Sequence, residues 1–137
     1  MTQYEDHNSH STHDIRVAVQ HAQEMLHHNA FAAAEQQGRE ILKSFPNEPN
    51  ALFIIGVSLK GLARFSEARK TFQVLVKQTP KFALAHQELG FTLHALKQIR
   101  QAIISLKDAV NVDTHLIHSW KRLSELLLAT GDSHASE

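Results

Sequence analysis

Residues 56–72, "GVSLKGLARFSEARKTF", decide the fold of this sequence. Gly56 and Ala68 are small residues in a run that otherwise has the apolar spacing of an amphipathic helix. A shift of 34 residues along the chain places Gly56 on Gly90 and Ala68 on Ala102. The stretch is therefore one copy of an internal repeat.

Breaks in the apolar pattern recur at regular distances along the rest of the chain. They predict seven short helices that pair as antiparallel hairpins, over residues 15–28, 31–45, 49–62, 65–78, 83–96, 99–111 and 117–130. Residues 1–14 are polar and rich in Ser, Asn and His, so we expect a loose, disordered tail there.

The length, charge and cysteine content of the chain make some classes of partner and location less favoured. The chain has 137 residues, which suits one domain, and its 14 Lys and Arg balance 14 Asp and Glu. With no net charge to attract phosphates, we expect no nucleic acid and no membrane as partner. The absence of cysteine, of a signal-peptide pattern in "MTQYEDHNSHSTHD" and of a long apolar run favours a cytoplasmic location.

The sequence contains no motif that is typical of a catalytic, nucleotide-binding or metal site. The sequence lacks a phosphate-binding glycine loop, a nucleophile elbow and any zinc-ligand spacing. The histidines His7, His10 and His13 are regularly spaced but fall in the polar tail. We therefore predict no enzyme activity, no catalytic residue, no cofactor and no metal.

The period of 34, with two helices per repeat and the pattern W-x2-L-G-x2-Y, A-x3-F and P, resembles the tetratricopeptide repeat. The second repeat has at these places Leu52, Ile55, Gly56, Leu59, Ala68, Phe72 and Pro80. The third has His86, Leu89, Gly90, Leu93, Ala102, Leu106 and Thr114. The first has Ala18, His21, Ala22, Met25, Ala34, Gly38 and Pro46, and the fourth has Trp120, Leu123, Ser124 and Leu127.

The resemblance implies an all-α fold, a right-handed α-solenoid of antiparallel helix hairpins with about three and a half repeats. The domain would cover residues 15–137, as repeats 15–48, 49–82 and 83–116 and a partial repeat 117–137. Gly56 with Ala68, and Gly90 with Ala102, would let the paired helices approach closely. His86, at the place of the usual Trp, is expected to be a packed and hydrogen-bonded ring.

A second line of residues on the first helix of each hairpin is expected to face a concave groove. On residues 49–62 this line has the spacing i, i+4, i+7 and lies on a different face of the helix from the core positions. We predict a partner-binding groove formed by Val19, Gln23, Phe53, Val57, Lys60, Gln87, Phe91, His94, Lys121 and Glu125. The alternative is that Phe53 and Phe91 only cover a shallow surface or pack on a missing segment.

Some tetratricopeptide domains grip the acidic C-termini of heat-shock chaperones with Lys, Asn and Arg from three successive repeats. The corresponding places here hold Val19, Gln23, Ile54, Leu84 and Glu88, which cannot form that charge-assisted clamp. An apolar groove instead favours an amphipathic helix, an extended hydrophobic peptide or a helix of the parent protein.

Two functions remain open. The chain is either a scaffold that binds a protein or peptide in its groove, or the docking or regulatory N-terminal domain of a larger enzyme. The ending "HSWKRLSELLLATGDSHA" resembles the closing repeat before the catalytic domain of bacterial tetratricopeptide sulfotransferases. That resemblance would place every catalytic residue in a domain absent from this chain.

The last predicted helix has more apolar residues than one preceding hairpin can cover. We expect weak homodimers through Trp120, Leu123, Leu126, Leu127 and Leu128.

Overall fold

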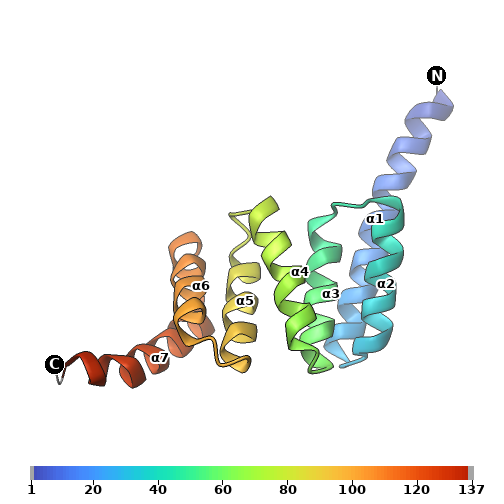
Figure 1. Ribbon diagram of the computed structural model, residues 1–137. Helices are drawn as coiled ribbons and strands as arrows, with labels where there is room; N and C mark the ends of the chain where they lie inside the picture. Colours follow the sequence, from blue (N-terminus) through green and yellow to red (C-terminus); the bar gives the residue numbers. More distant parts are fainter. Residues whose placement is uncertain (1, 136–137) are drawn as a thin grey trace. The chain divides into compact units, whose positions relative to one another are not determined.

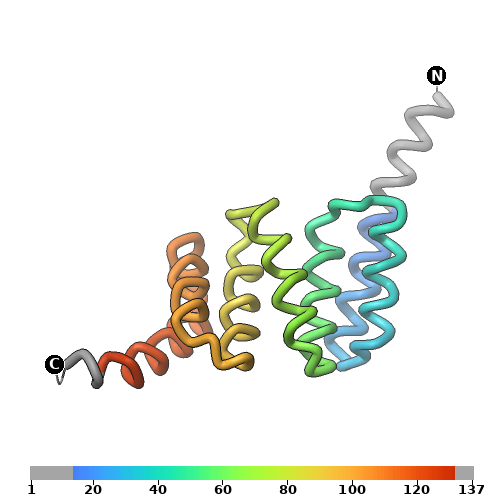
Figure 2. Tube along the Cα trace, in the orientation of Figure 1, coloured from blue at the N-terminus to red at the C-terminus, as the bar shows by residue number. Residues whose placement is uncertain are grey.

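The structure is a computed structural model that describes the backbone of residues 2–135 and the side chains of residues 14–131. Within this range it has seven helices (Figures 1 and 2): α1 (Thr2–His27), α2 (Phe31–Ser44), α3 (Pro49–Gly61), α4 (Phe65–Gln78), α5 (Ala83–Ala95), α6 (Ile99–Val112) and α7 (Ile117–Ala135). The bounds of α2 to α6 agree with the predicted ranges to within one residue at each end. The prediction of an all-α fold of antiparallel hairpins is confirmed.

The first and last helices are longer than predicted. Helix α1 begins at Thr2, so the helical backbone continues through the stretch predicted as a loose tail. Residues 1–14 contain neither Pro nor Gly, so nothing in them interrupts a helix that extends from the packed part of α1. Helix α7 continues past residue 130, where it was predicted to end, because the single Gly131 weakens a helix without ending it.

The helices form two compact units, Met1–Ala63 and Arg64–Glu137. In the first unit α2 packs against α1 and α3, and α1 also contacts α3. A Cβ atom built at Gly38 on α2 would lie 2.7 Å from Ile55 Cγ1 and 3.3 Å from the Ala51 carbonyl oxygen on α3. Only glycine therefore allows this approach of α2 and α3. The core of the unit consists of Val19, Ala22, Ala34, Ile41, Ala51 and Ile54.

In the second unit α5 packs against α4 and α6, and α7 packs against α6. A Cβ atom built at Gly90 would lie 2.7 Å from Leu106 Cγ and 3.4 Å from the Ala102 carbonyl oxygen. Ala102 and Leu106 are themselves completely buried. The predicted small-residue crossing of Gly90 and Ala102 is therefore confirmed between α5 and α6.

Three turns that end the first helix of a hairpin share one conformation. Asn29, Ala63 and Lys97 have φ angles of 59°, 60° and 62° and follow one another at the repeat period of 34. After Asn29 and Lys97 the next residue donates its N–H to a carbonyl five residues back, Ala30 to Met25 and Gln98 to Leu93. This is the left-handed C-terminal cap that satisfies the last carbonyls of a helix.

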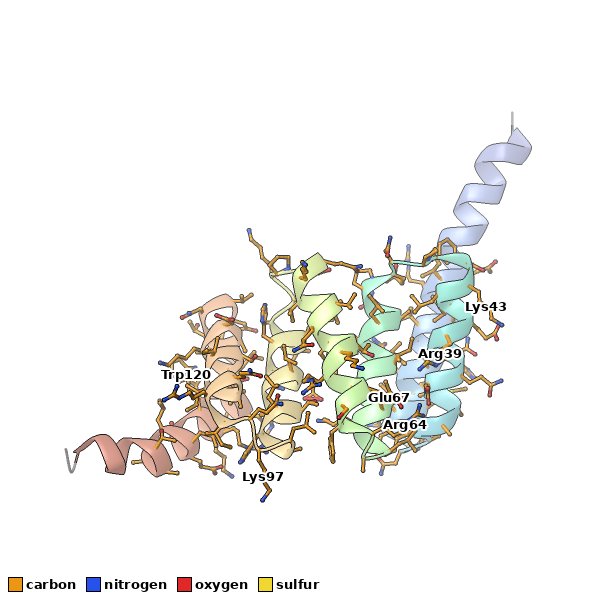
Figure 3. The ribbon with its side chains drawn as sticks, viewed as in Figure 1. Arg39, Lys43, Arg64, Glu67, Lys97 and Trp120 are labelled. Carbon is orange, nitrogen blue, oxygen red and sulfur yellow. The ribbon has the colours of Figure 1, made fainter. Side chains whose placement is uncertain are left out.

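In the third and fourth repeats the first position of the pattern holds a ring that is hydrogen-bonded to the preceding turn. His86 Nε2 donates to the Pro80 carbonyl oxygen at 2.7 Å, and Trp120 Nε1 donates to the Thr114 carbonyl oxygen at 2.9 Å. His86 is 9% exposed, so the expectation of a packed, hydrogen-bonded ring is confirmed. Figure 3 labels Trp120 on α7 and Lys97 at the turn after α5.

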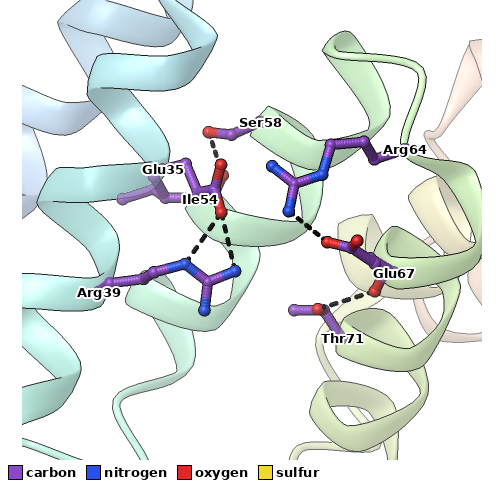
Figure 4. Close-up of polar contacts among 7 residues, drawn as sticks. All are labelled: Glu35, Arg39, Ile54, Ser58, Arg64, Glu67 and Thr71. Carbon is purple, nitrogen blue, oxygen red and sulfur yellow. Dashed lines mark hydrogen bonds and ion pairs between the residues drawn. The ribbon is translucent and has the colours of Figure 1, made fainter.

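The polar contacts drawn in Figure 4 join residues three or four positions apart in sequence. Arg39 pairs with Glu35 in α2, and Arg64 pairs with Glu67 at the start of α4. The buried Ser58 hydroxyl donates to the Ile54 carbonyl oxygen in α3. Exposed pairs one turn apart contribute at most about 0.5 kcal/mol each, so they support the helices and do not define a site.

Candidate partner-binding site

In the first unit the predicted surface line on α3 is partly open to solvent. Phe53, Val57 and Lys60 are half-buried, whereas Ile54 and Leu59 between them are fully buried. Of the positions that the spacing predicted for the core of this helix, Ile55 and Leu59 are buried, whereas Leu52 is half-buried and Leu62 is 37% exposed. Phe53 and Val57 leave apolar surface accessible on this helix.

The contribution of α1 differs from the prediction. Val19 is 9% exposed and belongs to the core with Ala22 and Ala34, so it offers a partner almost no surface. Gln23 is exposed and joins a shallow polar pocket of about 270 Å³ on α1. Helix α1 therefore adds polar surface and no apolar surface to the predicted groove.

In the second unit side chains of α5 and α7 form a pocket of about 210 Å³. Its lining residues are Phe91, His118, Lys121, Arg122 and Glu125. Phe91 is half-buried, and Lys121 and Glu125 are exposed. Three predicted groove residues thus line one pocket. We call it the α5–α7 pocket.

Arg122 organises this pocket. Its guanidinium carbon lies 4.5 Å from the centre of the Phe91 ring, within the range of a cation–π contact. Its Nη1 donates to His94 Nδ1 at 3.2 Å, so this imidazole nitrogen acts as the acceptor. Its Nε lies 4.0 Å from Glu125 Oε2. Arg122 therefore links the predicted groove residues Phe91, His94 and Glu125.

Gln87 differs from the prediction. It is 8% exposed, and its Oε1 accepts a hydrogen bond of 2.6 Å from Ser119 Oγ, which is fully buried. Loss of this hydrogen bond would leave a buried amide oxygen without a partner, which lowers the free energy of unfolding by about 1–3 kcal/mol. Gln87 therefore fastens α5 to α7 and is not part of the accessible surface.

The apolar residues of α7 divide into two groups. Leu123 and Leu126 are 4% and 5% exposed, so they belong to the core and cannot form the predicted self-association surface. Ile117, Trp120, Leu127 and Leu128 are the exposed large apolar residues of this helix. Leu128 is the most open of the predicted set, with 67% of its surface exposed.

Sequence reasoning missed Arg122 and His118. The comparison of clamp positions ended at Leu84 and Glu88 in the third repeat. One further shift of 34 residues places His118 and Arg122 at those same positions in the fourth. The repeat period was thus the signal that could have found them.

Neither a cluster of metal ligands nor a membrane-spanning helix is found in the part of the chain that the structure describes. Among residues 14–131 no three His, Asp or Glu side chains are placed to hold a metal ion, and His7, His10 and His13 lie outside that range. No helix found within residues 2–135 is long and apolar enough to cross a bilayer.

Comparison with known proteins identifies the class of fold. No family model matches the sequence. The first tetratricopeptide domain of Spaghetti (RPAP3), bound to an HSP90 peptide, superposes with a TM-score of 0.79 at 13% identity over 85% of this chain and 93% of that one. An O-GlcNAc transferase of Thermobaculum terrenum gives a TM-score of 0.81 at 23% identity over 85% of this chain and 22% of that one. The chain therefore has the tetratricopeptide-repeat fold.

The sequence is also similar to part of one curated protein. Human tetratricopeptide repeat protein 7B is 29% identical over 98 residues, which are 72% of this chain. The chain spans only 12% of the length of that relative. These similarities give no support to the sulfotransferase resemblance.

Proposed function

We propose that this chain is a protein–protein interaction scaffold that binds a peptide or a helix of a partner on the first helices of its hairpins. The observation that supports this proposal is the α5–α7 pocket, in which the half-buried Phe91 ring lies beside the Arg122 guanidinium. Phe53 and Val57 offer comparable apolar surface on α3 in the other unit.

The pairing of an anchored aromatic ring with polar neighbours suits peptide recognition. A ring already fixed by contacts loses little side-chain entropy when a partner covers it, and aromatic and Arg side chains are enriched at binding hot spots. The neighbour of the same fold bound to an HSP90 peptide supports binding of a peptide in general.

A second candidate function is docking within a larger enzyme. The O-GlcNAc transferase observation supports it, because a region with this fold makes up only part of that enzyme. A sulfotransferase parent is a narrower form of the same candidate. Mass spectrometry of the native protein separates the two functions, because a parent enzyme would be far heavier than the 15.4 kDa of this chain.

The scaffold proposal is tested by selecting peptides from a displayed library on the wild-type chain and measuring their affinity for variants. Phe53→Gln and Phe91→Gln should each weaken selected peptides that contact the altered ring. Loss of one ring contact, at about 1.5–3 kcal/mol, corresponds to roughly ten- to hundredfold in Kd. Gln is preferred to Lys at position 91 because a Lys would face Arg122.

Matched controls come from exposed apolar residues on second helices. Val74 on α4 is 47% exposed and Ile104 on α6 is 59% exposed. Val74→Gln and Ile104→Gln should leave Kd unchanged. Peptides whose affinity depends on Val74 or Ile104, and on neither Phe53 nor Phe91, would show that the partner surface lies elsewhere.

A further inference from the structure

A pocket of about 190 Å³ lies between α1 and α2 in the first unit, where these helices pack side by side (Figure 1). Its apolar lining consists of Ile15 and Ala18 on α1 and of Ile41 and Phe45 at the C-terminal end of α2. Ile41 is 5% exposed, and the other three are half-buried. This pocket, which we call the α1–α2 pocket, therefore offers apolar surface to a ligand.

The internal repeat indicates what this pocket lacks. Ala18 occupies the first position of the repeat pattern, which holds Leu52, His86 and Trp120 in the following repeats. The rings of His86 and Trp120 each donate an N–H to a carbonyl oxygen of the turn before their helix. Helix α1 begins at Thr2, so Ala18 follows helical backbone instead of a turn. The first repeat thus lacks both the ring and the turn that occur together at this position in the third and fourth repeats.

We propose that the α1–α2 pocket binds a tryptophan side chain of a partner protein, in the place where later repeats hold a large side chain of their own. The volume suits an indole, because an apolar cavity of about 150 Å³ holds a benzene ring. This site is separate from the partner surface proposed for the first helices, since Phe53, Val57 and Phe91 are not among its lining residues.

The charged groups that line the pocket favour a ring with an N–H donor. Among its described lining residues these are the carboxylates of Asp14 and Glu40, which accept hydrogen bonds and donate none. Lys43 donates to Glu40 Oε1 at 2.9 Å, but a carboxylate accepts more than one hydrogen bond. An aliphatic side chain would cover these oxygens without offering a donor, and an acidic one would be repelled by them.

The test uses the tripeptide Gly-Trp-Gly with an acetylated N-terminus and an amidated C-terminus, titrated into the chain with labelled isoleucine methyl groups. The Ile15 and Ile41 methyl signals should shift on binding. Ala18→Leu introduces the residue that the second repeat holds at this position. It should raise Kd by about tenfold or more, because the larger side chain fills the space that the indole needs.

The matched control is Ala33→Leu, which makes the same change at an exposed position on α2 outside the pocket lining. It should leave Kd unchanged. Thermal unfolding should show that Ala18→Leu is at least as stable as the wild-type chain, because it fills a cavity. A tripeptide with 1-methyltryptophan tests the donor without any change in the protein. Its Kd should be about two- to tenfold higher, because the indole N–H is lost.

The proposal is overturned if the tripeptide leaves the Ile15 and Ile41 signals unmoved, if Ala18→Leu and Ala33→Leu have equal effects, or if methylation of the indole leaves Kd unchanged. Tighter binding of free indole than of the tripeptide would identify a small aromatic molecule as the ligand and likewise overturn it.

A second copy of this chain is the other possible source of the ring, because Trp120 is its one tryptophan and is 45% exposed. Ile15 and Ile41 signals that shift with protein concentration alone, in wild type and not in Ala18→Leu, would identify Trp120 as the occupant. That result would overturn the partner protein as the source. None of these outcomes depends on Phe53 or Phe91, so failure here leaves the scaffold function standing.

Discussion

At the scale of single residues, the repeat fixes backbone conformation as well as side-chain type. Asn29, Ala63 and Lys97 all adopt a left-handed conformation, which costs an ordinary L-residue about 1–2 kcal/mol and suits Gly or Asn. Asn29 is thus well suited to its turn, whereas Ala63 and Lys97 are strained. The cap geometry after α5 keeps Lys97 in place, with its N–H bonded to the His94 carbonyl oxygen at 2.9 Å.

Replacing Lys97 by Gly should therefore stabilise the protein. We expect Lys97→Gly to raise the free energy of unfolding by about 1 kcal/mol, because glycine has no Cβ to strain the turn. Lys107→Gly, within α6, is the matched control and should lower it by about 1 kcal/mol. Urea denaturation of both variants measures the difference. If Lys97→Gly and Lys107→Gly lower the free energy of unfolding by the same amount, the turn at Lys97 is not strained.

At the scale of helices, small residues decide how closely neighbours approach. The Gly90 site has no room for a methyl group next to Leu106, whereas nothing lies within 4 Å of a Cβ atom built at Gly131 on α7. The same chemical change should therefore have opposite effects at the two positions.

Gly90→Ala should lower the free energy of unfolding by about 1–3 kcal/mol, the usual cost of overpacking. Gly131→Ala should raise it by about 0.5–1 kcal/mol, because alanine is the better helix former and meets no neighbour. Thermal unfolding of the two variants and of the wild-type chain shows whether each substitution lowers or raises the free energy of unfolding as predicted. Stabilisation by Gly90→Ala would mean that the α5–α6 crossing tolerates a wider separation.

The helices were predictable because their signals are local and repeated. The bounds of α2 to α6 follow from apolar spacing and from turns that recur with the repeat. The ends of α1 and α7 were missed because a polar composition and a single Gly weaken helices without ending them. The repeat of small residues in the sequence also predicted the close approach of two helices at Gly90.

The candidate site was only partly predictable. Helical spacing found Phe53, Val57 and Phe91, because one helix alone fixes which residues share a face. It placed Val19 and Gln87 on the same surface, since it could not show that a neighbouring helix buries them. The role of Arg122 depends on contacts across α5 and α7, some 30 residues apart in sequence. Such contacts follow from packing and not from local spacing.

At the scale of the whole molecule, we propose that α7 mediates weak self-association through its exposed apolar residues. Leu127 and Leu128 are 40% and 67% exposed, and Trp120 lies on the same helix with 45% exposed. Leu127→Ser with Leu128→Ser should raise the dimer dissociation constant by about tenfold or more, since each covered leucine contributes about 1.5–3 kcal/mol. Sedimentation equilibrium measures this constant.

The control for self-association is Ile104→Ser on α6, which removes an apolar side chain that is 59% exposed from a different helix. It should leave the dissociation constant unchanged. If the wild-type chain sediments as a monomer at every accessible concentration, the role proposed for α7 is wrong.

The central claim is that the first helices of the hairpins carry the partner surface. The most direct measurement is an NMR titration of the isotopically labelled chain with a library-selected peptide, with amide and side-chain shifts followed. The account predicts that the largest shifts fall either on Phe53 and Val57 of α3 or on Phe91 and Arg122 of the α5–α7 pocket, according to which unit the peptide contacts. Shifts concentrated instead on α2, α4 and α6, with these four residues unmoved, would contradict it.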